Sequence, residues 1–215
     1  MTLHADLFWS FRSPYSYLAT RRYVALTEQY DLEIALRQVF PLAVRKKDFF
    51  SSGPPGWLAY TTRDVIRLAP FHDMPIAMPR PDPIVQDLAT GEVAEEQPHI
   101  FRLVRMGQAA SRRGRGLAYA DAVSRLIWGG TDGWNEGDHL REAAASVGLD
   151  HDDLTGEAES DADALDAEVR ANQEALETAG HWGVPTLLFE GEPFFGQDRI
   201  EVALWRMKQA GLTER

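Results

Sequence analysis

The sequence FRSPYSYLA at residues 11–19 decides how the chain begins to fold, and Ser13 followed by Pro14 is its central feature. A serine side chain can cap the first turn of a helix, and proline suits the first helical position because the N–H it lacks has no partner there. We therefore predict a helix from residue 14 to about residue 29. Residues 4–10, just before this stretch, hold three consecutive large apolar side chains and predict a strand.

The hydrophobic pattern outside this stretch predicts a strand, a helix and a strand, then a long, mostly helical section, and finally two strands and a helix. Residues 32–39 alternate and predict the second strand. Gly183 marks a change of period, and the last strands are expected at 184–189 and 193–195, before a helix at 198–209. The middle section is rich in turn residues from 41 to 98, and its expected helices are 61–72, 98–113, 117–128, 138–147 and 160–178.

Three ordered motifs resemble those of a known family. They are Phe11–Ala19, Gly183-Val184-Pro185-Thr186 and Phe195-Gly196-Gln197-Asp198-Arg199. Together they are similar to 2-hydroxychromene-2-carboxylate isomerase and the kappa-class glutathione transferases, in the DsbA-like branch of the thioredoxin superfamily. The resemblance covers both ends of the chain closely and the middle only in layout. It implies an α/β, thioredoxin-like fold in which residues 1–40 and 181–215 form the thioredoxin-like domain and residues 41–180 an inserted loop-rich and helical domain.

The chain contains no cysteine, which excludes a disulfide framework, a thiolate metal site and a cysteine nucleophile within it. Thioredoxin-like proteins carry Cys-x-x-Cys at the turn that here holds Ser13 and Ser16. Any thiol chemistry must therefore use a sulfur that arrives as a ligand.

Ser13 is the expected catalytic residue, and glutathione is the cofactor that the resemblance implies. The start of a helix favours an anion, because its N–H groups are unpaired and the helix dipole is positive there. A hydroxyl at this position can donate a hydrogen bond to a thiolate and lower the pKa of the thiol. Considered alone, the local sequence favours an ordinary helix cap, and the other two motifs of the resemblance reverse this preference.

Four residues are expected to hold glutathione. The resemblance implies a cis Pro185 that exposes the backbone N–H and C=O of Val184 to the cysteinyl part of the ligand. It also implies that Gln197 and Asp198 receive the γ-glutamyl end. The alternatives are a trans proline at the start of a strand and an aspartate that only caps the last helix.

The second substrate is expected to meet Phe11, Tyr15, Lys46 and Asn172. Asn172 lies thirteen residues before Pro185, where a polar residue of the isomerases faces the substrate, and Lys46 or Lys47 would pair with a carboxylate. The substrate site would also need an apolar wall, and the aromatic candidates for it are Phe8, Trp9, Phe11, Tyr15, Phe49, Phe50, Trp57 and Tyr60. Core packing of the aromatic residues and solvent exposure of the lysines are the alternatives.

The chain departs from the family pattern after the second strand. Relatives often carry Gly-Asn and a nearby lysine that contact glutathione, whereas residues 47–55 here contain no asparagine and Arg63 follows instead of a lysine. Ser10 stands where an aspartate is frequent. These differences affect the expected affinity for glutathione and the identity of the aromatic substrate. The motif around Ser13, which would activate the thiol, keeps the family pattern.

The net charge of −11 argues against binding to nucleic acid, which requires clustered lysine and arginine. Residues 132–177 hold 15 acidic and two basic side chains, a charge of −13, which indicates solvated helix faces or an acidic docking surface. The basic run 111–116 is expected to be a solvated turn between helices. No apolar stretch is long enough to span a membrane, and the N-terminus does not resemble a signal peptide, so we expect a cytoplasmic protein without membrane or nucleic-acid partners.

Together these features predict a glutathione-dependent isomerase that acts on a conjugated aromatic carboxylic acid similar to 2-hydroxychromene-2-carboxylate. The alternatives are a kappa-like glutathione transferase and a non-catalytic thioredoxin-like binding module. No metal is expected, because the six histidines are scattered without ligand spacing. The expected partner is a small-molecule substrate, and the family makes a homodimer possible.

Overall fold

The computed structural model describes residues 2–46, 49–52, 56–87 and 90–215, and these form a mixed α/β fold around a four-stranded sheet. The sheet order is β2-β1-β3-β4, where β1 is Leu3–Trp9, β2 is Leu32–Gln38, β3 is Thr186–Phe189 and β4 is Glu192–Phe195. β1 and β2 are parallel, whereas β3 runs antiparallel to both β1 and β4. A parallel pair needs a crossover connection, which α1 (Pro14–Gln29) supplies.

The second half of β1 is buried on both faces of the sheet, since successive side chains of a strand point in opposite directions and Leu7, Phe8 and Trp9 are all buried. Leu7 and Trp9 belong to the larger core cluster together with Tyr17 of α1. Phe8 lies in a second cluster with Leu176 of α9 (Ala162–Thr178). Burial on both faces explains why β1 ends in a continuous apolar run at Leu7, Phe8 and Trp9, whereas its first half alternates with His4 and Asp6.

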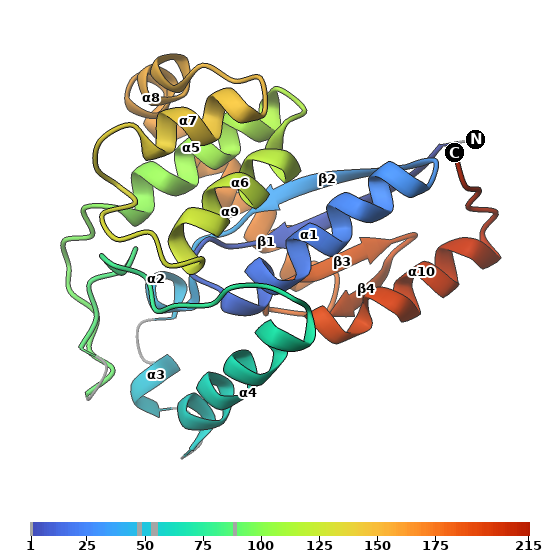
Figure 1. Ribbon diagram of the computed structural model, residues 1–215, viewed down its shortest axis with the longest axis horizontal. Helices are drawn as coiled ribbons and strands as arrows, with labels where there is room; N and C mark the ends of the chain where they lie inside the picture. The colour runs from blue at the N-terminus through green and yellow to red at the C-terminus, as the bar shows by residue number, and fades with distance from the viewer. Residues whose placement is uncertain (1, 47–48, 53–55, 88–89) are drawn as a thin grey trace.

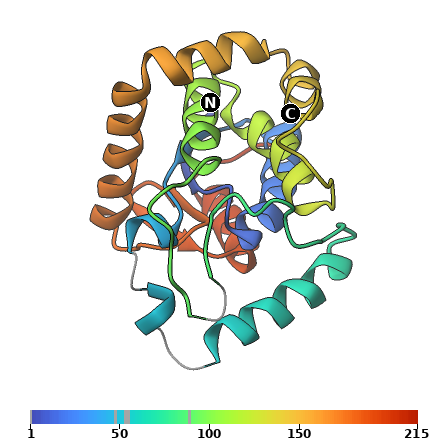
Figure 2. The same ribbon diagram turned by 90° about the vertical axis from the view of Figure 1, so that its left-hand side faces the viewer.

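The other helices between β2 and β3 are α2 (Leu42–Arg45), α3 (Phe49–Ser52), α4 (Trp57–Phe71), α5 (Ile100–Arg112), α6 (Gly116–Trp128), α7 (His139–Ser146) and α8 (His151–Ser160). Figure 1 shows α5 to α9 gathered at the end of the sheet toward which β1 and β2 run, with both termini at the opposite end. α4 stands apart from this group in the turned view of Figure 2. The chain ends with η1 (Gln197–Arg199) and α10 (Ile200–Gln209). None of the described helices has the length and apolar character needed to cross a membrane.

The structure follows the predicted elements closely at both ends of the chain and less well in the middle. The strand expected at 4–10 spans residues 3–9, and α1 begins at Pro14 as expected. α4 begins four residues earlier than expected, and α2, α3 and α8 were not predicted. α2 and α3 are too short to show a helical period. Asp150 caps the start of α8 by accepting hydrogen bonds from the N–H groups of Asp152 and Asp153. Hydrophobic periodicity does not detect such a cap.

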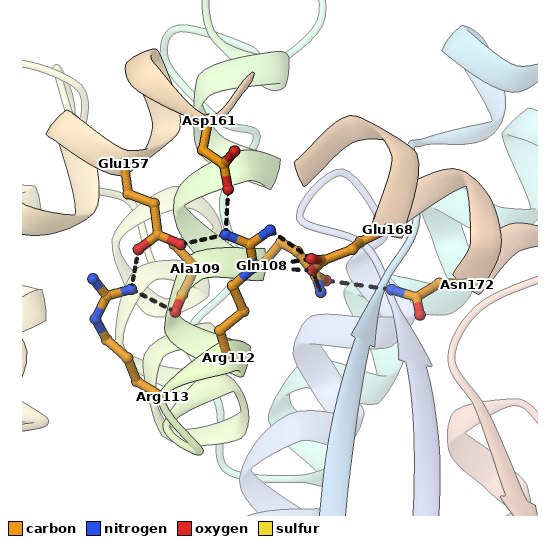
Figure 3. A network of polar contacts seen from close by, with 8 residues as sticks. All are labelled: Gln108, Ala109, Arg112, Arg113, Glu157, Asp161, Glu168 and Asn172. Carbon is orange, nitrogen blue, oxygen red and sulfur yellow. Dashed lines mark hydrogen bonds and ion pairs between the residues drawn. The ribbon is translucent and has the colours of Figure 1, made fainter. Parts of the chain in front are cut away.

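Two arginines at the C-terminal end of α5 bind acidic residues of α8, of α9 and of the junction between them, as Figure 3 shows. Arg112 Nη1 lies 2.7 Å from Glu157 and 2.6 Å from Asp161, and its Nη2 lies 2.5 Å from Glu168. Arg113 also pairs with Glu157. The basic run is thus an exposed turn between α5 and α6, as expected, and its arginines Arg112 and Arg113 also pair with the acidic section at the surface.

We expect Arg112→Met to lower the free energy of unfolding by about 1–2 kcal/mol at neutral pH. The hydrogen bond from Arg112 holds the pKa of Glu168 below its ordinary value. The stabilisation is therefore complete above the pKa of the unfolded state and is lost as the pH falls through the lower pKa of the folded state. Urea unfolding at several pH values should show the difference from wild type shrinking below about pH 4.5. The control is Arg170→Met, which removes an exposed arginine of α9. A difference that stays constant with pH would contradict the assignment.

Candidate active site

Ser13 lies at the C-terminal end of β1, where the chain turns into α1. Its backbone is extended, with φ −102° and ψ 112°, and its N–H donates to the Ser10 carbonyl at 3.1 Å. The Ser13 Oγ accepts a hydrogen bond from the N–H of Ser16 at 3.1 Å, and Pro14 occupies the first turn. Ser13 is thus the helix cap, and its half-buried hydroxyl sits at the positive end of the α1 dipole.

The fold brings the Ser13 hydroxyl next to Pro185, although the two residues are far apart in sequence. The Val184–Pro185 peptide bond is cis, as the resemblance implied. Ser13 Oγ donates to the Val184 carbonyl at 3.3 Å, and the Pro185 carbonyl accepts from the N–H of Gly196 at 2.9 Å. We refer to Ser13, Val184 and Pro185 as the serine–proline site. Within the described residues the N–H of Val184 has no acceptor, so it is available to a ligand with a peptide carbonyl.

Gln197 and Asp198 follow β4 directly after Gly196, whose N–H binds the Pro185 carbonyl. The two side chains differ in exposure. Gln197 is buried, and its Oε1 lies 3.4 Å from Arg22 and 3.2 Å from the His72 ring. Asp198 is exposed and binds Arg199 at 2.7 Å. The alternative that Asp198 caps the last helix is wrong, because the residue at that position is Arg199 and no side chain caps α10. The Gln197 amide is already held by Arg22 and His72, so a γ-glutamyl group would share these contacts.

The four residues expected to meet the second substrate occupy different environments. Phe11 has no exposed surface, so it supports the turn before Ser13 and offers no face to a substrate. The Tyr15 hydroxyl donates to Asp64 of α4 at 2.9 Å, and burial and this carboxylate raise its pKa. Lys46 is exposed, with its ammonium 5.6 Å from the centre of the Trp182 ring. Lys47 lies outside the described residues.

Asn172 is buried between α9, β2 and α5. Its Nδ2 donates to the Gln38 carbonyl at 3.0 Å and to Gln108 Oε1 at 3.3 Å. Gln108 in turn donates to Glu168 at 2.8 Å, so Asn172 forms the inner end of the polar network in Figure 3. These bonds hold the Asn172 amide at the C-terminal end of β2, the edge of the sheet at which the first strand meets Ser13.

An aromatic cluster that the sequence analysis did not assemble lies directly before Pro185. The His181 ring stacks on Phe195 with 3.9 Å between ring centres and on Trp182 with 5.6 Å. Trp182 also contacts Phe49 at 5.4 Å, and Phe49 contacts Trp57 at 5.3 Å. Trp57, Trp182 and Phe195 keep 37–42% of their surface exposed. The signal in the sequence was the pair His181-Trp182 immediately before Gly-Val-Pro.

The expected apolar wall is therefore revised. Phe8 and Trp9 are buried in the core, like Phe11, and are excluded from it. Phe49, Phe50 and Trp57 contact one another beside Trp182, which keeps them as candidates. Tyr60 is 60% exposed on α4.

His181 is held as a neutral ring acceptor. Its Nδ1 accepts a hydrogen bond from the N–H of Gly183 at 2.9 Å, so the proton of the neutral ring resides on Nε2. Burial lowers the pKa of His181, because it penalises the charged imidazolium. The residue thus fixes the backbone just before the cis peptide bond without adding charge near neutral pH.

The loop between α4 and α5 is tied to the turn before Ser13. Arg12 forms two hydrogen bonds with Asp82, at 2.5 and 2.6 Å, and its guanidinium lies 5.4 Å from the centre of the Trp128 ring. Tyr17 of α1 donates to the Pro75 carbonyl at 2.7 Å. These contacts anchor a long loop beside the serine–proline site.

Two surface cavities lie elsewhere in the molecule. One of about 210 Å³ is lined by residues of α5 and of the loop before α7, and one of about 220 Å³ by the loops around Met78 and Thr131. Neither includes Ser13, Val184 or Pro185 in its lining. The chemistry of the polar groups, and not the cavity volume, marks the serine–proline site as the candidate.

Solved structures similar to this chain share its fold. 2-Hydroxychromene-2-carboxylate isomerase matches with a TM-score of 0.73 and 21% identity, over 97% of this chain and 96% of that chain. A probable DsbA oxidoreductase from Streptomyces coelicolor matches with a TM-score of 0.67 and 21% identity, over 97% and 89%. The cytosolic disulfide reductase DsbM from Pseudomonas aeruginosa, solved with GSH, matches with a TM-score of 0.60 and 16% identity, over 97% and 100%.

The sequence comparisons agree with this fold. No curated protein matches the chain. Residues 5–207, however, match the family described as the DSBA-like thioredoxin domain. A match over most of the length, together with the strand order and the cis-proline beside the first helix, leads to one conclusion: the chain belongs to the DSBA-like thioredoxin domain family.

Proposed function

We propose that this protein is a glutathione-dependent isomerase of a conjugated aromatic carboxylic acid similar to 2-hydroxychromene-2-carboxylate. The observation that carries the proposal is the Ser13 hydroxyl at the start of α1, 3.3 Å from the carbonyl that precedes cis-Pro185, in a chain without cysteine. A dithiol oxidoreductase needs its own thiols. A hydroxyl at the same place instead suits a sulfur supplied by a ligand.

The residues of the site fit glutathione. The N–H of Val184, which has no acceptor among the described residues, matches a cysteinyl carbonyl in the manner of an added strand. Gln197, Arg22 and Asp198 offer an amide, a cation and a carboxylate to the γ-glutamyl end. The structure of the disulfide reductase DsbM with GSH supports glutathione use on this fold.

Ser13 would stabilise the sulfur as a thiolate. Its hydroxyl would turn from the Val184 carbonyl toward the sulfur and donate a hydrogen bond, and the α1 dipole would favour the negative charge. Bound glutathione supplies a thiolate that adds reversibly to a conjugated double bond, permits rotation about the resulting single bond and leaves unchanged. The half-exposed rings of Trp182 and Phe195 would hold the planar substrate beside this position.

A kappa-like transferase would use the same activated thiol and release the conjugate. A binding module without catalysis is the second candidate, and one observation favours it. The Ser13 hydroxyl and the Gln197 amide already have protein partners, so the site is satisfied without a ligand.

Calorimetric titration with glutathione tests the proposal. Wild type is expected to bind and to raise the ultraviolet absorbance of the thiolate, and Ser13→Ala is expected to lower the thiolate fraction about tenfold or more. Ser146→Ala, at an exposed serine in the last turn of α7, is the control and should behave as wild type. Absence of binding to wild type would contradict both enzymatic functions. If the aromatic acid is converted, unchanged total glutathione indicates an isomerase, and its consumption indicates a transferase.

A further inference from the structure

Two cations at the end of α2 lie beside the residues that precede Pro185. Arg45 Nε donates to the Phe40 carbonyl at 2.7 Å, and its Nη2 donates to the Trp182 carbonyl at 3.0 Å. The ammonium of Lys46, the next residue, lies 5.6 Å from the centre of the Trp182 ring. Both side chains are therefore directed to the segment that leads into the serine–proline site.

Arg45 forms no ion pair with any carboxylate of the described residues. Its Nη1 is buried and has no hydrogen-bond partner in the described part of the chain. Among the described residues no carboxylate lies within 4.0 Å of Arg45 or Lys46, and Glu177 acts on Arg45 only from a longer distance. A buried N–H of a cation without an acceptor is costly, and a carboxylate is the acceptor that a guanidinium binds best.

The surroundings of these cations are apolar. Trp182 contacts Phe49, which in turn contacts Trp57, and both tryptophans are partly exposed. Low polarity around a cation strengthens its attraction for an anion. A carboxylate carried on an apolar or extended molecule therefore suits this corner better than a free inorganic anion.

We propose that Arg45 and Lys46 form a carboxylate-binding site for the ligands of the serine–proline site. The proposal rests on the proposed function, and the carboxylate has two possible sources. One is the glycyl end of glutathione, which relatives contact through a lysine where this chain has Arg63. The other is the carboxylate of the aromatic acid, whose ring would contact Trp182.

Calorimetry with two pairs of probes tests the site and separates the sources. The first pair is glutathione and its glycyl monoethyl ester, and the second is salicylate and salicylamide, so each pair differs in one carboxylate. We expect wild type to bind the acid of at least one pair about 5- to 10-fold more tightly than the other member of that pair. Lys46→Ala should reduce that preference to less than about 2-fold, whereas Lys46→Arg should retain it.

Lys208→Ala is the matched control, because Lys208 also places its ammonium over an aromatic ring, 5.0 Å from the centre of Tyr30, on α10. Arg45→Gln is the second variant, and it should abolish the preference as Lys46→Ala does. Its folding is checked by thermal unfolding, since Arg45 also binds two backbone carbonyls. If this variant does not fold, Lys46→Ala and Lys46→Arg decide the outcome.

Loss of the preference in the glutathione pair assigns the site to the glycyl carboxylate, and loss in the salicylate pair assigns it to the aromatic acid. Wild type without any preference for the acids overturns the site, as does a preference that Lys46→Ala leaves intact or that Lys208→Ala removes equally. A protein that does not bind glutathione but distinguishes salicylate from salicylamide through Lys46 keeps the site and refutes the proposed function. The two failures are thus distinguishable.

Discussion

The thiol introduced by Ser13→Cys is expected to titrate about one to three pH units below the value of about 8.5 for free cysteine. Residue 13 caps a helix of 16 residues, and its side chain accepts a hydrogen bond from the N–H of Ser16. A thiolate would receive that hydrogen bond and the favourable field of the helix, which the neutral thiol uses less well. The Val184 carbonyl, 3.3 Å from Ser13 Oγ, opposes the effect only in part.

The measurement is the ultraviolet absorbance of the thiolate as a function of pH. Because the natural chain has no cysteine, the variant contains a single thiol and the titration needs no correction for others. Ser146→Cys is the control, since Ser146 lies in the last turn of α7, where the helix dipole disfavours an anion. A pKa for the Ser13→Cys thiol equal to that of the control would refute the anion-stabilising role on which the proposed function rests.

Gly107→Ala is expected to destabilise the fold by about 1–2 kcal/mol, although alanine is the better helix former. A Cβ at residue 107 of α5 would lie 2.5 Å from Gln38 Nε2 and 2.8 Å from the Phe11 ring. Gln38 and Phe11 are fully buried, so neither can move aside without disturbing the core. The overpacking cost of about 1–3 kcal/mol exceeds the gain of about 1 kcal/mol in helix propensity.

Gly156→Ala is the matched control, because Gly156 lies within α8 and nothing is within 4 Å of an added Cβ. This variant is expected to be more stable than wild type by about 0.5–1 kcal/mol. Urea unfolding of both variants compares the two effects directly. Equal or increased stability of Gly107→Ala would show that α5 does not pack against Phe11 and Gln38 as described.

The contrast between Gly107 and Gly156 shows what the local sequence pattern can and cannot predict about contacts. Both stand inside helices, and their neighbours in sequence do not reveal that one contacts the end of β2 and the other only solvent. α8 and Arg112 differ in the same way. The cap of α8 at Asp150 is a local feature of the sequence, whereas the three acidic partners of Arg112 are distant in sequence. The helical section was predicted in outline, because periodicity reports burial of a face and not the identity of the neighbour.

The candidate site divides in the same way. Ser13-Pro14 specified a capped helix after a buried strand, and the absence of cysteine excluded a dithiol, because both depend only on residue chemistry and near neighbours. The sequence could not show which side chains share a site, so Phe11 was placed at the substrate and His181 and Trp182 were passed over. Contacts over long separations depend on how the sheet and helices pack. Only the tertiary structure placed Ser13 against the carbonyl before cis-Pro185, and brought the guanidinium of Arg45 to Trp182 with a buried Nη1 that has no partner among the described residues.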